Sequence, residues 1–427
     1  MAASIFGGNG GAVEVSAAGS IVPESFVATG GQTAFTLTKF IYTLNSSSLL
    51  VFVNGQLQTS GRDFTETSIS TFALAEGCAA GDNVDVIGFP LVTLTGNFAG
   101  YNNGQLSGWR NKCINGGFEI WQRGTSFPSI PINTPTYTAD RWTITWAGTA
   151  GSAGINLGNG YTAGTNAMLL VGVASNSYVD LRQRFEADDV EKWRGNTVTL
   201  SARIYNNTGA TIIANSLVVL GSVPSAKDNW AGSTQVLVST FTHAAILNAT
   251  WGYVYYTFNP SAYAGIANGF DIGLRYQGLL AGQAINWAEI QLEVSPIPLP
   301  FDWKPAGTEL VLCQRYYEKS YDQGIVPGTI SPNGQETNYI VLSSGTIVNA
   351  QMAIKYKIPK RAGAAIVLNT YSPATGTIAK IRDAQNAIDL NATLDSGGEN
   401  SFRLYYTQTA NATTNVVAHW TSSAELV

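Results

Sequence analysis

The sequence contains little charge, little cysteine and almost no histidine. Only 12% of its 427 residues are charged, about half the usual share in soluble proteins. The cysteines Cys78, Cys113 and Cys313 are scattered and odd in number, so we expect no disulfide framework, a reducing site of synthesis, and thiols that serve as small core residues. The two histidines, His243 and His419, lie near no nucleophile signature. This argues against a catalytic triad.

Basic clusters and long apolar runs are also missing. The net charge of −5 argues against a nucleic-acid partner, which would require a basic patch. No segment approaches the roughly 20 apolar residues that a membrane helix needs. Residues 1–8 have no basic region followed by an apolar run. We therefore expect neither membrane insertion nor a signal peptide. No phosphate-binding loop and no Cys/His metal spacing occurs.

Glycine and aromatic residues are plentiful, with 45 Gly, 19 Tyr and 10 Trp. This composition is typical of short strands, tight turns and large, weakly charged surfaces, which oligomerisation would cover. The length predicts two to four domains. Repeated alternation of apolar and polar residues, with few helical patterns, predicts an all-β protein.

The N-terminal part of the chain divides into three predicted segments. Residues 1–21 are too poor in large apolar side chains to fold alone, so we expect an anchoring segment that orders on a partner. Residues 22–93 predict a small β-domain, in which the strand Leu49–Val53 runs into Asn54-Gly55, a strong hairpin signal. Residues 94–112 are rich in Gly and Asn and predict a linker.

Residues 113–305 predict a jelly-roll module. Asn115-Gly116-Gly117 predicts a turn, after which we expect a strand over Phe118–Arg123. A second strand is expected over Tyr137–Trp146, with its tryptophans on one face. Glu186–Arg194 is the one convincing helix before residue 300. Further alternating strands separated by turns, among them Trp251–Phe258, favour a sandwich or jelly roll.

Residues 306–427 predict a C-terminal β-sandwich. The prolines of Ser295–Pro300 cannot enter a sheet ladder and mark the preceding edge. Thr308–Tyr317 fits one or two helical turns followed by a strand, and its pattern leaves the extent of each open. Several alternating segments between Tyr339 and Trp420 predict the strands of the sandwich.

An ordered set of motifs resembles a known family. These are Asn115–Gly124, Tyr137–Trp142, Gln291-Leu-Glu-Val, Pro300-Phe-Asp-Trp and Cys313–Tyr317. Over roughly residues 111–320 they resemble the central module of bacteriophage and prophage tail fibre proteins, which is similar in turn to jelly-roll carbohydrate-binding modules. Val51–Gln58 and its neighbours resemble N-terminal repeats of tail fibres and tailspikes, and the C-terminal end resembles their tip domains.

The resemblance implies a virion structural protein that is made in the host cytoplasm and is not an enzyme. It would be a homotrimeric tail fibre that binds other tail or baseplate proteins through its N-terminus and attaches to a host surface polysaccharide. One alternative is a glycan depolymerase tailspike, but such enzymes usually carry a repeat-built β-helix, and this chain shows no repeat of fixed period. Another is a neck or spike fibre that binds no receptor.

A fibre held at its N-terminus presents its far end first, so we expect recognition in the C-terminal third. Its candidate ligand-binding residues lie in two predicted loops, since loops on a rigid sandwich often carry binding residues. In the first, Tyr371 would stack on a sugar ring while Asn369 and Thr370 bond its hydroxyls. In the second, the polar partners are Asp395, Glu399 and Asn400. The alternative is that both are ordinary hairpin turns.

A second candidate set is Trp121 with Arg123. An aromatic ring and a guanidinium suit sugar recognition, but tryptophans of an alternating strand more often face the core, and we favour this structural interpretation. The likeness to carbohydrate-binding jelly rolls places Glu119 and Glu289 where some members hold calcium. Here Trp287-Ala-Glu-Ile replaces the usual paired acids, so we expect no metal and no cofactor.

Overall fold

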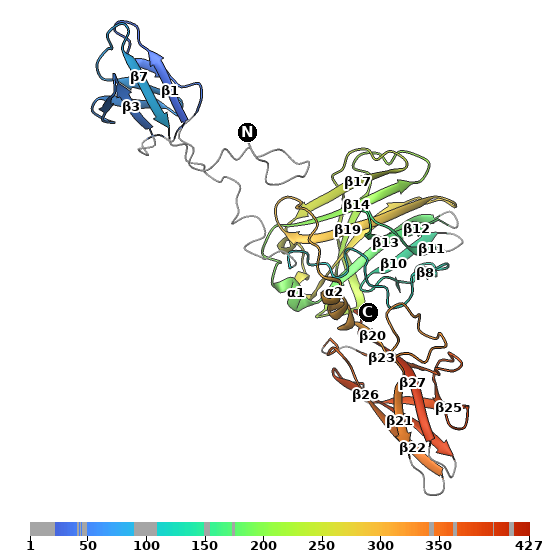
Figure 1. Ribbon diagram of the computed structural model, residues 1–427. Coiled ribbons are helices and arrows are strands. Elements are labelled where there is room, and N and C mark those ends of the chain that lie inside the picture. Colours follow the sequence, from blue (N-terminus) through green and yellow to red (C-terminus); the bar gives the residue numbers. More distant parts are fainter. Residues whose placement is uncertain are drawn as a thin grey trace. The chain divides into compact units, whose positions relative to one another are not determined.

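The computed structural model describes residues 22–40, 42, 44, 49–88, 109–148, 154–172, 176–340, 346–361, 365–395, 397–409 and 414–427. The chain divides into two compact units, Met1–Phe98 and Ala99–Val427. Nearly all of the regular secondary structure among the described residues is β-strand in antiparallel sheets, which confirms the all-β fold class (Figure 1). The predicted anchor at residues 1–21 and most of the predicted linker lie outside the described residues. Among the described residues, no helix has the length and apolar character needed to cross a membrane.

The first unit packs a four-stranded sheet and a three-stranded sheet around its own core. The first sheet has the order β1 (Val22–Val27), β7 (Asn83–Gly88), β3 (Leu49–Val53), β4 (Gln56–Gln58), and the second β2 (Ala34–Thr36), β6 (Thr71–Leu74), β5 (Phe64–Ser68). Asn54 and Gly55 have φ of 49° and 79° between β3 and β4. Two positive φ angles are typical of a type I′ turn, so the predicted hairpin is confirmed. The stacked rings of Phe35 and Phe72 lie in the core.

The second unit begins with a jelly roll of two six-stranded sheets. One sheet has the order β16 (Asn229–Thr240), β15 (Val218–Ala226), β18 (Phe270–Gln277), β13 (Asn176–Phe185), β10 (Thr143–Gly148), β9 (Thr136–Tyr137). The other has the order β17 (Thr250–Phe258), β14 (Val198–Asn207), β19 (Ala284–Val294), β12 (Asn166–Val171), β11 (Gly154–Asn159), β8 (Ser126–Phe127). Their facing sides enclose one large core, which includes the fully buried Trp146 and Trp287.

The opening of the jelly roll differs from the sequence prediction. Phe118–Arg123 forms no strand, because Phe118 has φ of 56° and the Asn115 side chain ties the segment into a turn. Its Nδ2 donates to the Ile120 carbonyl at 2.8 Å, and its Oδ1 accepts from the Ile120 amide at 3.0 Å. The second predicted strand begins only at Thr143, yet its tryptophans are buried as expected. The predicted helix is shorter, spanning α1 (Ala187–Glu191).

The C-terminal part starts with α2 (Ala306–Gln314) and β20 (Tyr317–Lys319), so the helix-then-strand pattern is observed. The main path of its eight-stranded sheet is β20, β27 (Thr414–Ser423), β24 (Lys380–Asp383), β25 (Ile388–Asp395), β26 (Ser401–Thr409), β22 (Thr346–Lys355), and both β21 (Glu336–Ile340) and β23 (Val367–Tyr371) pair with β27. One face of the sheet encloses a core containing Met352, Phe402 and Trp420. Asn338 of β21 donates to the Gln351 carbonyl of β22 at 2.9 Å.

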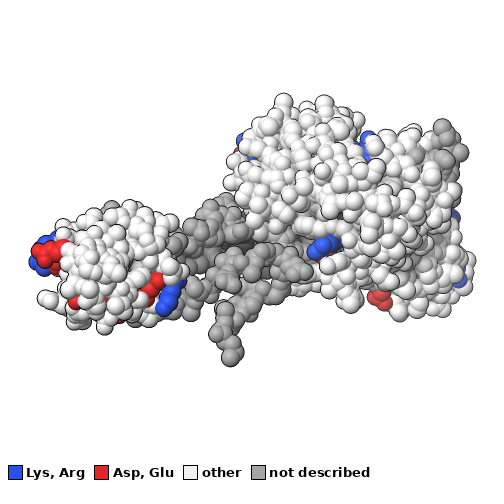
Figure 2. Space-filling view, turned by 90° about the horizontal axis from the view of Figure 1, so that it is seen from above, with Lys and Arg blue, Asp and Glu red and all other residues white. Residues whose placement is uncertain are grey.

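The three cysteines are buried, as predicted for small core residues. The surface seen in Figure 2 carries only scattered Lys, Arg, Asp and Glu side chains, in keeping with the low charge of the sequence. The low surface charge affects which ligands the protein can bind and whether copies of the chain associate.

Candidate functional site

The structure places Trp121 and Arg123 inside the second unit. Trp121 is 7% exposed, and its Nε1 donates to the Phe118 carbonyl at 2.7 Å. Arg123 Nη2 lies 3.1 Å from a Glu425 carboxylate oxygen, and its guanidinium lies 3.7 Å from the centre of the Tyr317 ring. Both side chains already have partners within the protein and are closed to an external glycan in this structure. This geometry favours their structural interpretation.

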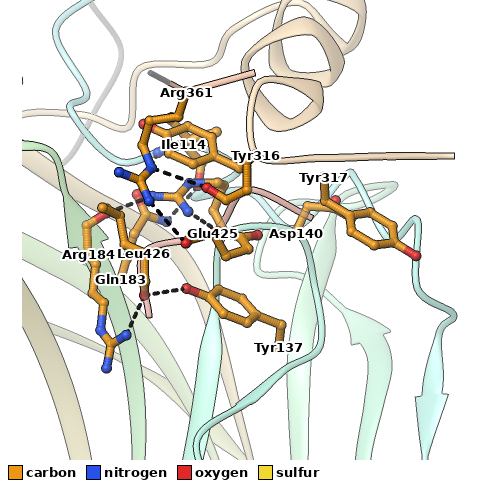
Figure 3. Close-up of polar contacts among 12 residues, drawn as sticks. Ile114, Tyr137, Asp140, Gln183, Arg184, Tyr316, Tyr317, Arg361, Glu425 and Leu426 are labelled. Atoms are coloured by element: carbon orange, nitrogen blue, oxygen red, sulfur yellow. Dashed lines mark hydrogen bonds and ion pairs between the residues drawn. The ribbon is translucent and has the colours of Figure 1, made fainter. Parts of the chain in front are cut away.

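A polar junction joins the chain's last residues to the jelly roll (Figure 3). Arg123 takes part in this junction through its ion pair with Glu425. Glu425 also forms an ion pair with Arg141, and the Leu426 carbonyl accepts a hydrogen bond from the Tyr137 hydroxyl at 3.2 Å. Arg361, from the C-terminal part, donates to the Ala424 carbonyl at 3.1 Å. The junction therefore holds the C-terminal sheet against the jelly roll.

The first predicted loop is largely a strand. Asn369, Thr370 and Tyr371 lie in β23, where Thr370 pairs with Trp420 of β27. Thr370 is fully buried, and the Tyr371 ring packs at 6.1 Å from that of Tyr321. The placement of these three residues in a loop was therefore wrong, because pairing with the distant β27 extends the strand beyond Leu368. The buried Thr370 hydroxyl cannot reach a surface ligand in this conformation.

The residues of the second predicted loop are exposed. Asp395 ends β25 and lies 3.4 Å from Arg403 of β26, while Glu399 and Asn400 lie between these two strands. The carbonyls of Glu399 and Asn400 accept hydrogen bonds from the Lys360 and Tyr356 amides, but their side chains are at the surface. Ligand binding by Asp395, Glu399 and Asn400 stays a prediction.

A more complete constellation of side chains lies on the outer face of the sheet that contains β17, β14 and β19. In β17 the core receives Val254 and Phe258, so the alternate residues Trp251, Tyr253 and Tyr255 point outward. All three are partly exposed. In the neighbouring β14, Arg203 and Tyr205 face the same way, and the register pairs Arg203 with Tyr253 and Tyr205 with Trp251. Five large side chains thus share one surface.

Tyr161, in the connection between β11 and β12, joins part of this surface into one cluster, which we call the aromatic face (Tyr161, Arg203, Tyr205, Trp251, Tyr253 and Glu289). Its ring lies edge-on to Trp251 with centroids 5.8 Å apart, and Trp251 lies 5.3 Å from Tyr205. The Arg203 guanidinium lies 4.1 Å from the Tyr161 ring centre and 4.5 Å from that of Tyr253. These cation–π contacts hold the guanidinium among the rings.

Glu289 faces Arg203 because β19 contains a bulge. The register between β14 and β19 shifts between Ser201 and Arg203, and Glu289 has φ of 49°. Its carboxylate accepts a hydrogen bond from the Thr162 hydroxyl at 3.0 Å and lies 3.7 Å from Arg203 Nε. Bulges often re-aim a side chain at a functional site. Here the bulge brings a carboxylate beside the guanidinium, and their charges compensate.

The Asn-Gly-Gly turn supports this bulge from the other side. The Ile290 amide donates to the Gly116 carbonyl at 3.0 Å, and Asn111 Nδ2 donates to the Ile290 carbonyl at 3.0 Å. A Cβ on Gly116 would overlap the Ile290 carbonyl oxygen, so the close approach requires glycine. The turn is thus a structural support for Glu289.

The aromatic face can bind a sugar by two kinds of contact. Its rings offer flat apolar surface for the C–H face of a pyranose, while Arg203 can donate and Glu289 can accept hydrogen bonds. Tyr161 is 46% exposed, and the hydroxyl of Tyr253 can both donate and accept a hydrogen bond. The sequence prediction recognised the strand Trp251–Phe258 but missed this face. The signal that could have revealed this face was the alternation of aromatic residues with core residues along that strand.

Glu119 and Glu289, suggested by resemblance as calcium ligands, have different surroundings. Glu119 lines a small cavity with Lys304 and Glu309, and burial, followed by the charge of Glu309, raises its pKa. Glu289 instead contacts Thr162 and Arg203 on the outer face. Within the part of the chain that the structure describes, no three acidic, His or Cys side chains form a metal-binding group.

Comparison with known proteins identifies no family. No family model matches the sequence, and no curated protein matches it.

Among solved structures, the enzymatically active domain of tailspike protein 4 from bacteriophage CBA120 matches with 14% identity and a TM-score of 0.27, over 44% of this chain and 22% of that chain. The module TmCBM61 in complex with β-1,4-galactotriose matches with 14% identity and a TM-score of 0.25, over 44% and 99%. A protein from Bacteroides thetaiotaomicron that carries the provisional name of sugar-binding protein also matches. The identity is 13% and the TM-score 0.27, over 44% of this chain and 100% of that chain. TM-scores this low do not establish a relationship.

Proposed function

We propose that this protein is a phage tail fibre that attaches the virion to a neutral glycan on the host surface, and that the aromatic face is its binding site. The observation that carries the proposal is the contact series Tyr205–Trp251–Tyr161, which ends at Arg203 and its compensating partner Glu289. Aromatic rings can stack on the apolar C–H face of a pyranose, while a few fixed polar groups bind its hydroxyls.

The tail fibre assignment also draws on the sequence motifs described above. Residues 1–21 would attach the fibre to tail or baseplate proteins, and the folded units would extend toward the host. Localisation in the virion and the tail partners belong to this proposal. An N-terminal deletion that still enters virions in normal amounts would exclude residues 1–21 as the anchor.

A neutral glycan fits the charge of the face better than an acidic one. The Arg203 guanidinium lies beside the Glu289 carboxylate at 3.7 Å. An acidic sugar would therefore be attracted by Arg203 and repelled by Glu289. Hydroxyl groups can accept from Arg203 and donate to Glu289 without leaving a charge uncompensated.

The proposed activity is binding without cleavage. Retaining and inverting glycosidases use two carboxyl groups at a defined separation. On the aromatic face, Glu289 is paired with an arginine and not with a second acid. Purified protein incubated with host capsule or lipopolysaccharide should release no reducing ends, and a steady release would show instead that the chain is a depolymerase.

The experiment is a binding assay of full-length protein on immobilised bacterial polysaccharides, comparing wild type with Trp251→Ala. Loss of one stacking ring costs about 1 kcal/mol or more, so we expect binding to weaken roughly tenfold. The matched control is Trp109→Ala, since Trp109 is 59% exposed and is not part of the aromatic face. Equal binding by both variants and wild type would exclude the aromatic face.

A further inference from the structure

A groove lies along β25 and β26 in the C-terminal part. Outward-facing residues such as Asn391 and Tyr405 line it, together with Leu390, Leu394 and Tyr406, which border the core. The volume of the groove is about 830 Å³, within the range of ligand-binding clefts. Leu404 and Tyr406 of β26 face the core, so Tyr405 between them points outward into the groove. Asp395, one of the residues predicted from the sequence, also lines it.

The strand register sets polar groups around the Tyr405 ring. Thr393 of β25 and Gln351 of β22 are the cross-strand neighbours of Tyr405 on its two sides. Asn391 and Thr407 line the same groove and are exposed. One aromatic ring is thus surrounded by hydroxyl and amide groups that can both donate and accept hydrogen bonds.

The charges at the ends of this groove are compensated. Asp395 pairs with Arg403 at 3.4 Å, and Asp389, which also lines the groove, pairs with Arg382 at 3.2 Å. The Arg403 guanidinium lies 5.4 Å from the centre of the Tyr405 ring, and its ion pair with Asp395 compensates this charge. The other side chains beside the ring, Thr393 and Gln351, are uncharged. A ligand that binds here therefore needs an apolar face for the ring and several hydroxyls, but it needs no net charge.

We propose that this groove is a second glycan-binding site, which takes a neutral sugar through stacking on Tyr405 and hydrogen bonds from Thr393, Thr407 and Asn391. The proposal extends the proposed function, but its residues are separate from those of the aromatic face. Each chain would then carry two weak sites, and simultaneous use of both would strengthen attachment to a polymeric glycan without any further contact.

The test is saturation-transfer NMR of the full-length Trp251→Ala protein, in which the aromatic face is weakened. The probes are methyl glucoside, methyl galactoside and N-acetylglucosamine at millimolar concentration, with glucuronate as the charged comparison. We expect transfer to at least one neutral sugar, and a reduction of roughly tenfold when Tyr405→Ala is added. Thr393→Arg, a change at an exposed position beside the ring, should block the groove and give the same loss.

Tyr339→Ala is the control, because Tyr339 is 66% exposed in β21 of the same sheet and lies outside the groove. An unchanged melting temperature of each variant would show that the fold is intact. If Trp251→Ala protein gives no transfer to any neutral sugar, or if Tyr405→Ala and Thr393→Arg leave the transfer unchanged, the second site does not exist. Either result leaves the assay on the aromatic face to be judged separately.

Discussion

At the residue scale, Glu425 is the carboxylate that pairs with arginines of the polar junction. Its carboxylate is buried and pairs with both Arg123 and Arg141. Removing one partner from a buried ionic group typically costs about 3–5 kcal/mol, because the remaining charge stays in a poorly solvated site. Replacement of Glu425 would leave two guanidinium groups in that position.

We predict that Glu425→Gln lowers the free energy of unfolding by about 3 kcal/mol. Urea denaturation followed by tryptophan fluorescence measures this change. Glu399→Gln is the matched control, since Glu399 is exposed, and its effect should stay within about 0.5 kcal/mol. Identical unfolding midpoints for both variants would mean that the ionic pairing contributes little.

His419 makes the C-terminal part sensitive to acid. Its Nδ1 lies 2.9 Å from the Ser320 hydroxyl, its Nε2 lies 2.9 Å from the Ser331 carbonyl, and its ring stacks on Tyr321 at 3.7 Å. Burial lowers the pKa of His419 below its ordinary value of 6.5. As pH falls through 6.5, the unfolded chain therefore binds a proton before the folded chain does, and stability is lost.

The prediction is a melting temperature that falls between pH 7.5 and 5 more steeply in wild type than in His419→Gln. The comparison with the variant is needed because Asp140 acts in the opposite direction. Burial raises the pKa of Asp140 from 3.8 to about 6, so this group gains stability as pH falls from 6 toward 4. Since Asp140 is present in both proteins, the difference between their pH profiles isolates His419. Parallel profiles would contradict the prediction.

At the element scale, the Asn-Gly-Gly turn and the bulge of β19 form one unit. The Gly116 carbonyl accepts from the Ile290 amide at 3.0 Å, next to the residue that carries the Glu289 carboxylate. Any side chain at residue 116 would push the turn away from β19, because it would overlap a backbone oxygen. The orientation of Glu289 thus depends on a turn far away in the sequence.

We predict that Gly116→Ala destabilises the jelly roll by about 1–3 kcal/mol, the usual cost of overpacking, and also weakens glycan binding. Thermal unfolding and the polysaccharide assay measure the two effects. Gly195→Ala is the control, because a Cβ there meets no atom within 4 Å. If Gly116→Ala melts and binds like wild type, the turn does not support the bulge.

The sequence predicted local elements better than the residues that meet across the fold. Alternation and the Asn-Gly signal were enough for Leu49–Val53 and its hairpin, since both depend on neighbouring residues. The missing strand at Phe118–Arg123 depends on side-chain bonds made by Asn115, which alternation does not report. Likewise, the burial of Thr370 follows from pairing with β27.

The candidate site could be predicted only in part for the same reason. The outward side of β17 follows from alternation once its core residues are known. The contact of Tyr161 with Trp251 joins a turn to a strand that is distant in sequence. The direction in which the Glu289 side chain points depends on a bulge. Neither contact leaves a local pattern. Sequence motifs therefore favoured a glycan-binding jelly roll, but the binding residues they suggested were Trp121 with Arg123 and two loops of the C-terminal third, not the aromatic face.

At the scale of the whole molecule, weak binding sites require several copies of the chain. One stacked ring and a few hydrogen bonds contribute only about 1 kcal/mol each, so a single site of this kind would hold a sugar weakly. Chains joined in an oligomer convert later contacts into intramolecular ones and raise the overall affinity. The sparse surface charge points toward the same arrangement, because apolar surface can be covered by another copy.

A candidate contact between copies is the set of exposed apolar side chains Val326, Ile330 and Ile378, which lie in two loops of the C-terminal part. These side chains are 46%, 65% and 54% exposed. The two loops that carry them are held together, since the Ser331 amide donates to the Pro373 carbonyl at 3.2 Å and Gly376 packs closely on the Gly328 carbonyl. Exposed apolar groups on a fixed surface often mark a protein interface.

We predict a homotrimer whose mass in light scattering is three times the chain mass of 45.3 kDa. The double variant Ile330→Lys and Ile378→Lys should shift the protein toward monomer, because two buried and unpaired lysines per chain cannot be accommodated in an apolar interface. Leu57→Lys is the matched control, as Leu57 is 54% exposed in the first unit. Wild-type protein that is monomeric at micromolar concentration would refute the trimer. A trimer that survives the double variant would instead place its interface elsewhere, and the multivalent attachment argued above would still hold.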